Sequence, residues 1–238
     1  MDSETIQAIT AHMQREKPNE CCGLIVHSAT DHEQYYPCRN IALHPDRDFT
    51  LDPRDYVAAA ARGEIIAVVH SHPRSRALPS HADRAGCEAS GLQWHIISGD
   101  GDIYSWTPEG WKAPLVGRDF KHGLLDCYSL VRDYYAEILG IDLPDFEREE
   151  DWWNKADGPD LYVDNFRAAG FFPVDASEIR EHDGILIQVR SKKVNHAAIY
   201  RGNNIMLHHV IDRLSGEEIY GGLYVKYTRM IVRHRSLT

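Results

Sequence analysis

The chain has 238 residues, of which 43% are hydrophobic and 26% are charged, a composition that excludes a disordered chain and predicts a packed globular protein. Its formal net charge is −10 and it has no run of basic residues, which argues against binding to nucleic acid or to an anionic membrane by bulk electrostatics. At this length we expect two domains.

The first quarter of the chain predicts helices that alternate with strands. Apolar residues recur at helical spacing between Ser3 and Pro18, where we expect an amphipathic helix. The segment GLIVH (23–27) follows as a strand. Asp52, followed by proline, is a helix cap, so a second, alanine-rich helix is expected over 53–62.

The next segment continues this alternation. EIIAVVHSH (64–72) is typical of a buried strand. A helix is then expected between its cap Ser80 and Gly91, and two strands follow over 94–98 and 102–106, around a GDGD turn. The first half is therefore predicted to be α/β.

Two histidines and an aspartate in this half predict a metal site. His70 and His72 are two residues apart on the expected strand, so their side chains share one face, and Asp83 lies in the first turn of the following helix. Two imidazoles and a carboxylate leave a tetrahedral zinc ion one open position, as catalytic sites require. The alternative is that Ser80 and Asp83 form only a helix capping box.

The spacing H-x-H-x7-S-x2-D, with Glu20 before CCGLIV, resembles the JAMM metallopeptidase family. The resemblance covers about residues 1–110 and implies an α/β domain with a cytidine deaminase-like β-sheet and flanking helices. It also implies that His70, His72 and Asp83 bind Zn²⁺ and that Glu20 is the general acid/base on the water that the zinc activates. Ser80 then helps to stabilise the tetrahedral intermediate.

The second half predicts an α+β domain after a linker. Residues 107–118 contain two prolines and two glycines without periodicity, so we place the domains at 1–114 and 115–238. Helices are expected first and an antiparallel sheet afterwards. The expected elements are helices over 127–140 and 161–170, followed by strands at GILIQV (184–189), NHAAIY (195–200), NIMLHHV (204–210) and LYVKYT (223–228).

Cys127 is the candidate nucleophile of this half. It lies where a loop becomes a helix, and a helix N-terminus stabilises a thiolate. His196 is the candidate base, and either His208 or His209 is the third member, because strand alternation directs one of the two into the site. The alternative for Cys127 is a small buried side chain without chemical function.

DCYSLV, NHAAIY and the histidine twelve residues after His196 resemble the NlpC-type, papain-like cysteine peptidases that cut bacterial cell-wall peptides. The resemblance covers about residues 118–234. It implies that Cys127 is the nucleophile, His196 the general base and acid, and His208 the residue that orients the imidazole. It also implies the γ-D-glutamyl-diaminopimelate bond of the peptidoglycan stem peptide as substrate. Most of the family has Ser-Gly where this chain has Tyr128 and Ser129, so the adjacent substrate pocket is expected to differ.

The succession of these two domains resembles the tail tip assembly proteins of lambda-like bacteriophages. It implies other tail tip proteins as partners, and a location first in the host cytoplasm and then in the virion tail tip. Five irregularly spaced cysteines without a CxxC pair predict free thiols, and the N-terminus lacks the pattern of a signal peptide. No apolar run approaches the ~18 residues of a membrane span. The alternative function is a non-catalytic structural protein that retains both sets of site residues.

Overall fold

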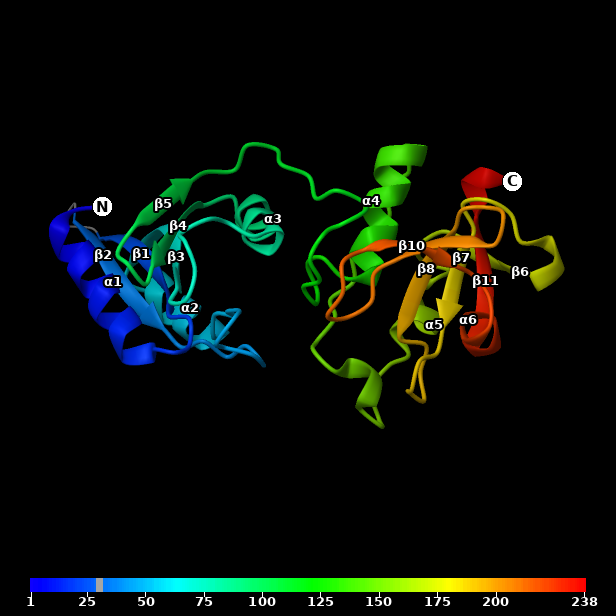
Figure 1. Cartoon of the computed structure of the whole chain (residues 1–238), viewed down its shortest axis with the longest axis horizontal. Helices are drawn as coiled ribbons and strands as arrows, with labels where there is room; N and C mark the ends of the chain where they lie inside the picture. Colours follow the sequence, from blue (N-terminus) through cyan, green and yellow to red (C-terminus); the bar gives the residue numbers. More distant parts are fainter. Residues whose placement is uncertain (29–31) are drawn as a thin grey trace. The chain divides into compact units, whose positions relative to one another are not determined.

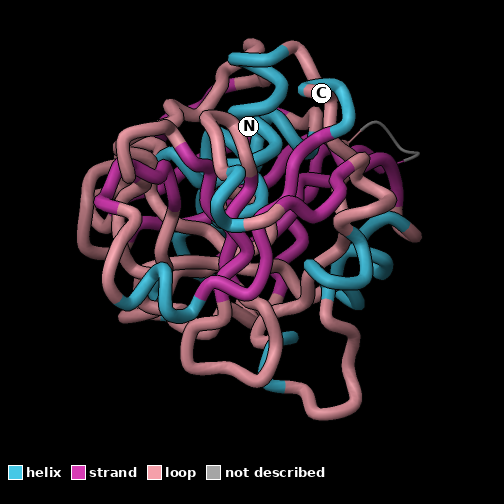
Figure 2. Tube along the Cα trace, turned by 90° about the vertical axis from the view of Figure 1, so that its right-hand side faces the viewer, coloured by secondary structure: helices cyan, strands magenta, loops and turns pink. Residues whose placement is uncertain are grey.

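The computed structural model describes residues 1–28 and 32–238. The chain divides into two compact units, Met1–Trp111 and Lys112–Thr238. Each unit combines one sheet with helices, and loops form a large share of the trace (Figures 1 and 2). The sequence prediction placed the domain boundary after residue 114, within the linker of residues 107–118.

Unit 1 contains a five-stranded sheet in the order β2-β1-β3-β4-β5. β3 and β4 pair in parallel, and the other neighbours are antiparallel. The strands are β1 Cys22–Ser28, β2 Glu33–Cys38, β3 Gly63–His72, β4 Gln93–Ser98 and β5 Ile103–Trp106. The helices are α1 Ser3–Glu16, α2 Pro53–Ala60 and α3 His81–Ser90. This confirms the α/β prediction for the first half.

The two faces of this sheet are covered by different helices. Val69 of β3 belongs to the core cluster that includes α1 residues, whereas Val68 belongs to the cluster to which α2 and α3 contribute. Because alternate residues of a strand share a face, His70 and His72 lie on the same face as Val68. The face that carries α2 and α3 therefore also carries the histidines.

The predicted elements of this unit are confirmed, apart from small differences at their ends and one strand that was missed. The helix predicted over 53–62 ends at Ala60. β2 was not predicted, since EQYYPC is short and contains Pro37. Proline is tolerated in edge strands, and β2 is at the edge of the sheet.

Unit 2 contains a six-stranded antiparallel sheet in the order β10-β9-β8-β7-β11-β6. The strands are β6 Phe171–Val174, β7 Gly184–Ile187, β8 His196–Tyr200, β9 Ile205–His208, β10 Gly216–Ile219 and β11 Thr228–His234. The α-helices are α4 Cys127–Leu139, α5 Leu161–Asn165 and α6 Leu223–Tyr227, and three-residue 3-10 helices lie at Trp152–Asn154, Ala176–Glu178 and Arg235–Leu237. The predicted α+β order, with α4 before an antiparallel sheet, is confirmed.

One predicted strand of this unit is wrong. LYVKYT was expected to be a strand because of its β-branched and aromatic residues, but Leu223–Tyr227 is the helix α6. Tyr224 packs against the sheet residues Ile185 and Met206 while Leu223 is exposed, so packing overrides the local preference. The helix predicted over 161–170 ends at Asn165, and β6, β10 and β11 were not predicted.

α4 covers one face of this sheet. Its residues Leu130 and Tyr134 belong to the core cluster that includes Ala197 and Leu207 of β8 and β9. This packing sets the start of α4 against the start of β8. Among the helices of residues 1–28 and 32–238, none has the length and apolar character that crossing a bilayer requires.

Candidate active sites

The first site is built on the end of β3. His70 is fully buried, and its Nε2 lies 3.2 Å from Nε2 of His72. The Phe49 ring stacks on His70 at 4.5 Å between centroids, and Nδ1 of His72 lies 3.0 Å from the carbonyl oxygen of Arg76. Both rings are therefore held with Nε2 directed at the same point.

Asp83 reaches this point from the first turn of α3. Its Oδ1 lies 3.2 Å from Nε2 of His70, and its Oδ2 lies 3.6 Å from Nε2 of His72. Ser80 caps the helix: its Oγ accepts from the Asp83 backbone N–H, and Asp83 Oδ2 accepts from the Ser80 backbone N–H and hydroxyl, both at 2.7 Å. The capping box is present, and its carboxylate also contacts both histidines.

Glu20 approaches from the segment before β1 and is buried. One ligand atom from each of Glu20, His70 and His72 lies within 4.8 Å of the other two. The backbone N–H of Glu20 donates to the Pro45 carbonyl at 2.7 Å, and the side-chain amide of Asn40 donates to the Glu20 carbonyl at 3.0 Å. Glu20 and Asp83 therefore each approach both histidines, and Ser80 joins this cluster through Asp83.

The electrostatics of the cluster fit a cation. Burial acts to raise the pKa of Asp83, but the neighbouring imidazoles of His70 and His72 outweigh it and hold that pKa well below its usual range. Burial acts to lower the pKa of His72, but its hydrogen bond to Asp83 raises it overall. Two imidazole nitrogens and an ionised carboxylate, convergent and shielded from water, are a donor set that suits Zn²⁺.

The second site begins at the first residue of α4. Cys127 is 9% exposed, and its sulfur lies 3.1 Å from the hydroxyl oxygen of Tyr162. Burial, followed by the charge of Asp126, raises the pKa of the thiol to about 11, against hydrogen bonds from Tyr162 and from the Ala197 backbone. The resting group is therefore a neutral thiol.

β8 and β9 place the histidines of this site. His196 Nε2 lies 3.1 Å from His208 Nδ1, and the rings meet edge to face. Burial, followed by the charges of the neighbouring histidines, lowers the pKa of His196 to about 3. In the part of the chain that the structure describes, the Cys127 sulfur has Tyr162 and Ala197 as hydrogen-bond partners and no imidazole among them.

His209 makes its contacts outside the hydrogen-bonded pair of His196 and His208. Its Nε2 is 3.1 Å from the carbonyl oxygen of Arg213, and its ring packs against Phe120 at 5.1 Å. Strand alternation therefore directs His208 toward His196 and His209 elsewhere. Sequence reasoning left these two open, and the assignment of His208 as third member stays a prediction that this geometry favours.

The start of α4 is fixed by a buried ion pair that sequence reasoning missed. Asp126 caps the helix by accepting from the backbone of Tyr128 and Ser129, and Arg148 Nε donates to its Oδ2 at 2.8 Å. Burial acts to raise the pKa of Asp126, but Arg148 and the Ser129 backbone outweigh it, so this pKa is lowered. Arg148 follows Asp126 by 22 residues in a segment without periodicity, so no pattern identified it.

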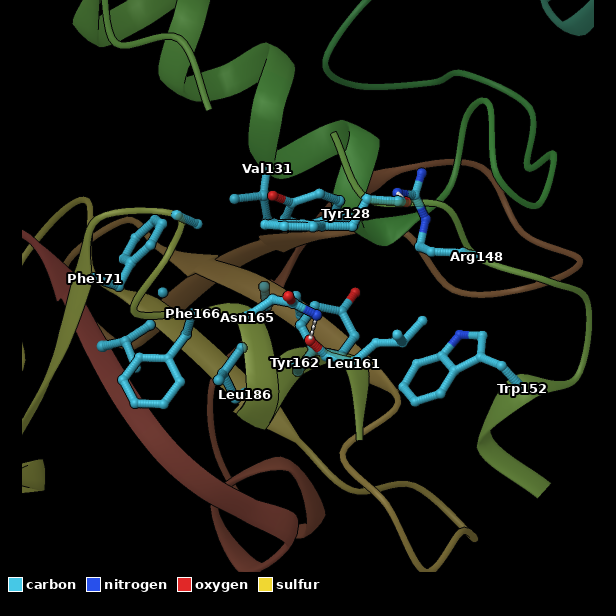
Figure 3. A pocket seen from close by; sticks show the side chains of 16 residues that line it. Tyr128, Val131, Arg148, Trp152, Leu161, Tyr162, Asn165, Phe166, Phe171 and Leu186 are labelled. Carbon is cyan, nitrogen blue, oxygen red and sulfur yellow. Dashed lines mark hydrogen bonds between the residues drawn. The ribbon is translucent and has the colours of Figure 1, made fainter. Parts of the chain in front are cut away.

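An apolar pocket of about 580 Å³, open solvent included, lies in unit 2, and Figure 3 shows Tyr162 among the side chains that line it. Tyr162 and Ala197, the two partners of the Cys127 sulfur, both line it. Tyr128 and Trp152 contribute aromatic surface. Tyr128, which stands where the cell-wall peptidase family usually has serine, therefore shapes this pocket. Tyr162 was also missed, because no motif marks a tyrosine 35 residues after the cysteine.

Two family models match the chain. The model described as prokaryotic homologs of the JAB domain matches residues 2–109, and the model of the NlpC/P60 family matches residues 103–233. The first therefore covers unit 1, and the second covers most of unit 2.

Three named relatives are similar to this chain. "Tail tip assembly protein K" of Escherichia phage N15 is 39% identical over 238 residues, which cover 100% of this chain and 97% of that protein. The protein of the same name from Escherichia phage lambda is 40% identical over 188 residues, 78% of this chain and 90% of that protein. "Desampylase" of Haloferax volcanii is 30% identical over 101 residues, 39% of this chain and 73% of that protein.

Proposed function

Because this chain belongs to the NlpC/P60 family and to the family of phage tail tip assembly protein K, we propose that it is a tail tip component that hydrolyses peptidoglycan with the Cys127 thiol. Its first unit is a JAB-like domain and its second an NlpC/P60 domain. The observation that carries the proposal is the hydrogen-bonded pair of buried imidazoles, His196 and His208, in the unit where Cys127 starts α4 and the backbone of Ala197, the residue after His196, contacts its sulfur.

The proposed chemistry is acyl transfer to sulfur. His196 takes the proton of the Cys127 thiol as the sulfur attacks an amide carbonyl of the stem peptide, and the Cys127 backbone N–H faces the developing oxyanion. The C–N bond breaks, and the departing amine takes the proton from His196. Water, deprotonated by His196, then attacks the thioester carbonyl; the C–S bond breaks, the acid is released and the Cys127 sulfur takes the proton back from His196. The γ-D-glutamyl-diaminopimelate bond is the proposed point of cleavage.

Burial sets a condition on this reaction. The thiol pKa of about 11 and the His196 pKa of about 3 mean that the ion pair is disfavoured while the site is covered. Proton transfer must therefore accompany attack rather than precede it.

Digestion of purified sacculi tests the thiol chemistry. We expect the wild type to release stem-peptide fragments and Cys127→Ala to release none. His208→Ala and His209→Ala form a matched pair of neighbours, of which the first alone should lose activity. Equal release by wild type and Cys127→Ala, or no release by either, would contradict the proposal.

The first unit supports a second proposed activity, a zinc-dependent hydrolysis of an amide or isopeptide bond. His70, His72 and Asp83 would hold the ion, which when bound supplies a Lewis acid and lowers the pKa of water. Glu20 would move the proton, and Ser80 would turn its hydroxyl from Asp83 Oδ2, to which it donates in the resting site, to donate to the tetrahedral oxygen. The convergence of these side chains supports the proposal, as does the similarity of this unit to a protein named desampylase.

Metal analysis tests the zinc site directly. We expect about one equivalent of zinc in the wild type and none in His72→Ala. His81→Ala is the matched control, because His81 stacks on Trp111 at 5.7 Å and lies outside the cluster. A wild type without zinc, or a full equivalent in His72→Ala, would count against the ligands.

The alternative remains a structural protein that binds other tail tip proteins and catalyses nothing. The enzymatic and the structural proposals both expect the protein to enter the tail in the host cytoplasm and to remain in the virion tail tip. Co-purification with tail particles tests that location. A Cys127→Ala phage that builds tails but penetrates the wall poorly supports catalysis, whereas unimpaired infection by that phage supports the structural role.

A further inference from the structure

The two imidazoles of the thiol site share one hydrogen bond, and its direction decides whether His196 can act as a base. A neutral imidazole carries one N–H. If His208 Nδ1 donates to His196 Nε2, His196 holds its own proton on Nδ1 and has no free lone pair. If His196 Nε2 donates instead, its Nδ1 is free to accept a proton. The 3.1 Å separation of the two nitrogens is compatible with both directions.

Glu218 lies at the far side of His208. Its Oε2 is 3.5 Å from His208 Nε2. An ionised carboxylate accepts hydrogen bonds and donates none, so it favours the His208 tautomer with the proton on Nε2. His208 Nδ1 is then an acceptor, and His196 must donate to it. We propose that Glu218 is a positioning residue that fixes both tautomers and leaves Nδ1 of His196 available as the base.

The surroundings hold Glu218 in this place. The hydroxyl of Tyr224 donates to the same Oε2 at 2.9 Å, and Arg213 Nη1 lies 3.5 Å from Oε1. The Tyr224 ring packs edge to face on His208, with centroids 5.3 Å apart. The titratable groups around His208 therefore come from β8, β10, α6 and the turn before β10. Among them, Glu218 is the acidic side chain that contacts the imidazole.

The neighbouring residue on β10 provides a matched control. As the residue next to Glu218 on β10, Glu217 points to the opposite face of the sheet, and its Oε1 pairs with Arg201 Nε at 3.3 Å. Glu217→Leu therefore removes an equivalent charge from the same strand without touching His208. Glu218→Leu removes both acceptor oxygens with little change in volume, and Glu218→Gln keeps one of them.

The experiment uses the full chain with ¹⁵N-labelled histidine. We expect the NMR spectra of the wild type to show the His196 proton on Nε2 and the His208 proton on Nε2. In Glu218→Leu we expect a mixture of tautomers and a roughly tenfold slower alkylation of Cys127 by iodoacetamide at neutral pH, since a base in the wrong tautomer cannot take the thiol proton. Glu218→Gln should recover part of both signals, and Glu217→Leu should match the wild type.

A His196 proton on Nδ1 in the wild type would overturn the proposal, as would wild-type tautomers and alkylation rate in Glu218→Leu. Because the wild-type spectrum alone tests the tautomer assignment, a variant that fails to fold does not remove the test. The inference deepens the thiol chemistry of the proposed function and rests on it for its catalytic meaning. Neither readout requires peptidoglycan. If the tautomers are as expected but the protein does not digest sacculi, peptidoglycan is not the substrate and the tautomer assignment still holds.

Discussion

Replacement of Arg148 by alanine should destabilise unit 2 by about 3 kcal/mol. The side chains of Arg148 and Asp126 are 5% and 3% exposed, and breaking such a buried pair costs about 3–5 kcal/mol because one charge remains without its partner. The lower end applies here, because Asp126 keeps hydrogen bonds from the backbone of Gly123, Tyr128 and Ser129.

Urea unfolding followed by hydrogen exchange of peptides from Lys112–Thr238 measures this loss within the unit concerned. With a slope of about 2 kcal/mol per molar urea, the midpoint should fall by about 1.5 M. Arg132→Ala is the control: its guanidinium lies 2.9 Å from Asp145, but the two side chains are 32% and 54% exposed. Such exposed pairs contribute about 0–1 kcal/mol. Equal midpoints for the two variants would refute the reasoning.

Four further predictions follow from the contacts of the two sites. Tyr162→Phe removes a hydrogen bond that lowers the pKa of the Cys127 thiol, so that pKa should rise above its value of about 11. Alkylation of Cys127 in mildly alkaline buffer should therefore slow. An unchanged alkylation rate would show that the Tyr162 hydroxyl does not act on the sulfur. The pKa of Asp126 is lowered in the folded chain, so its ionised carboxylate stabilises the fold above the pKa of the unfolded chain, near 4, and this stabilisation is lost as pH falls through the folded pKa. The unfolding free energies of wild type and Arg148→Ala should therefore converge as pH is lowered. A difference between the two that stays constant with pH would contradict this. Ser80→Ala should cost about 1 kcal/mol of unit 1 stability through the lost cap, measured by thermal unfolding against Ser80→Thr, which keeps the hydroxyl. Zinc at about 100 times its Kd should stabilise unit 1 by about 2.7 kcal/mol, a gain that a chelator removes from the wild type and that His72→Ala never shows.

The cluster of His70, His72 and Asp83, the proposed metal site, was predictable because the information that specifies it is local. The parity of His70 and His72 along one strand, and the three-residue step from Ser80 to Asp83 at a helix start, fix most of its geometry. What remained was to bring Glu20 to the end of β3, and β1 does so by pairing with β3. Spacing alone indicated His70, His72 and Asp83, whereas Glu20 and the catalytic role of Ser80 were implied only by the resemblance to a known family.

The thiol site was less accessible to sequence reasoning. The choice between His208 and His209 required the true parity of β9, which an apolar run does not reveal. Tyr162 contacts Cys127 from a distant segment and Glu218 contacts His208 from the neighbouring strand, and a tyrosine or a glutamate is too common to mark a site. α6 was assigned as a strand because intrinsic preferences ignore the sheet face that Tyr224 covers.

The capping box of α3 would couple binding of the proposed ion to the stability of the first turn of this helix. Asp83 Oδ2 anchors the Ser80 backbone and hydroxyl while it faces His72, so fraying of the first turn of this helix would pull a ligand out of place. The affinity for the proposed ion and the opening of the first turn of α3 would then be linked. A change that stabilises this turn, and so slows hydrogen exchange of the Asp83 amide, should raise the affinity for the ion, and the bound ion should slow that exchange. The Asp83 amide resonance alone would then report how much of the proposed site is occupied.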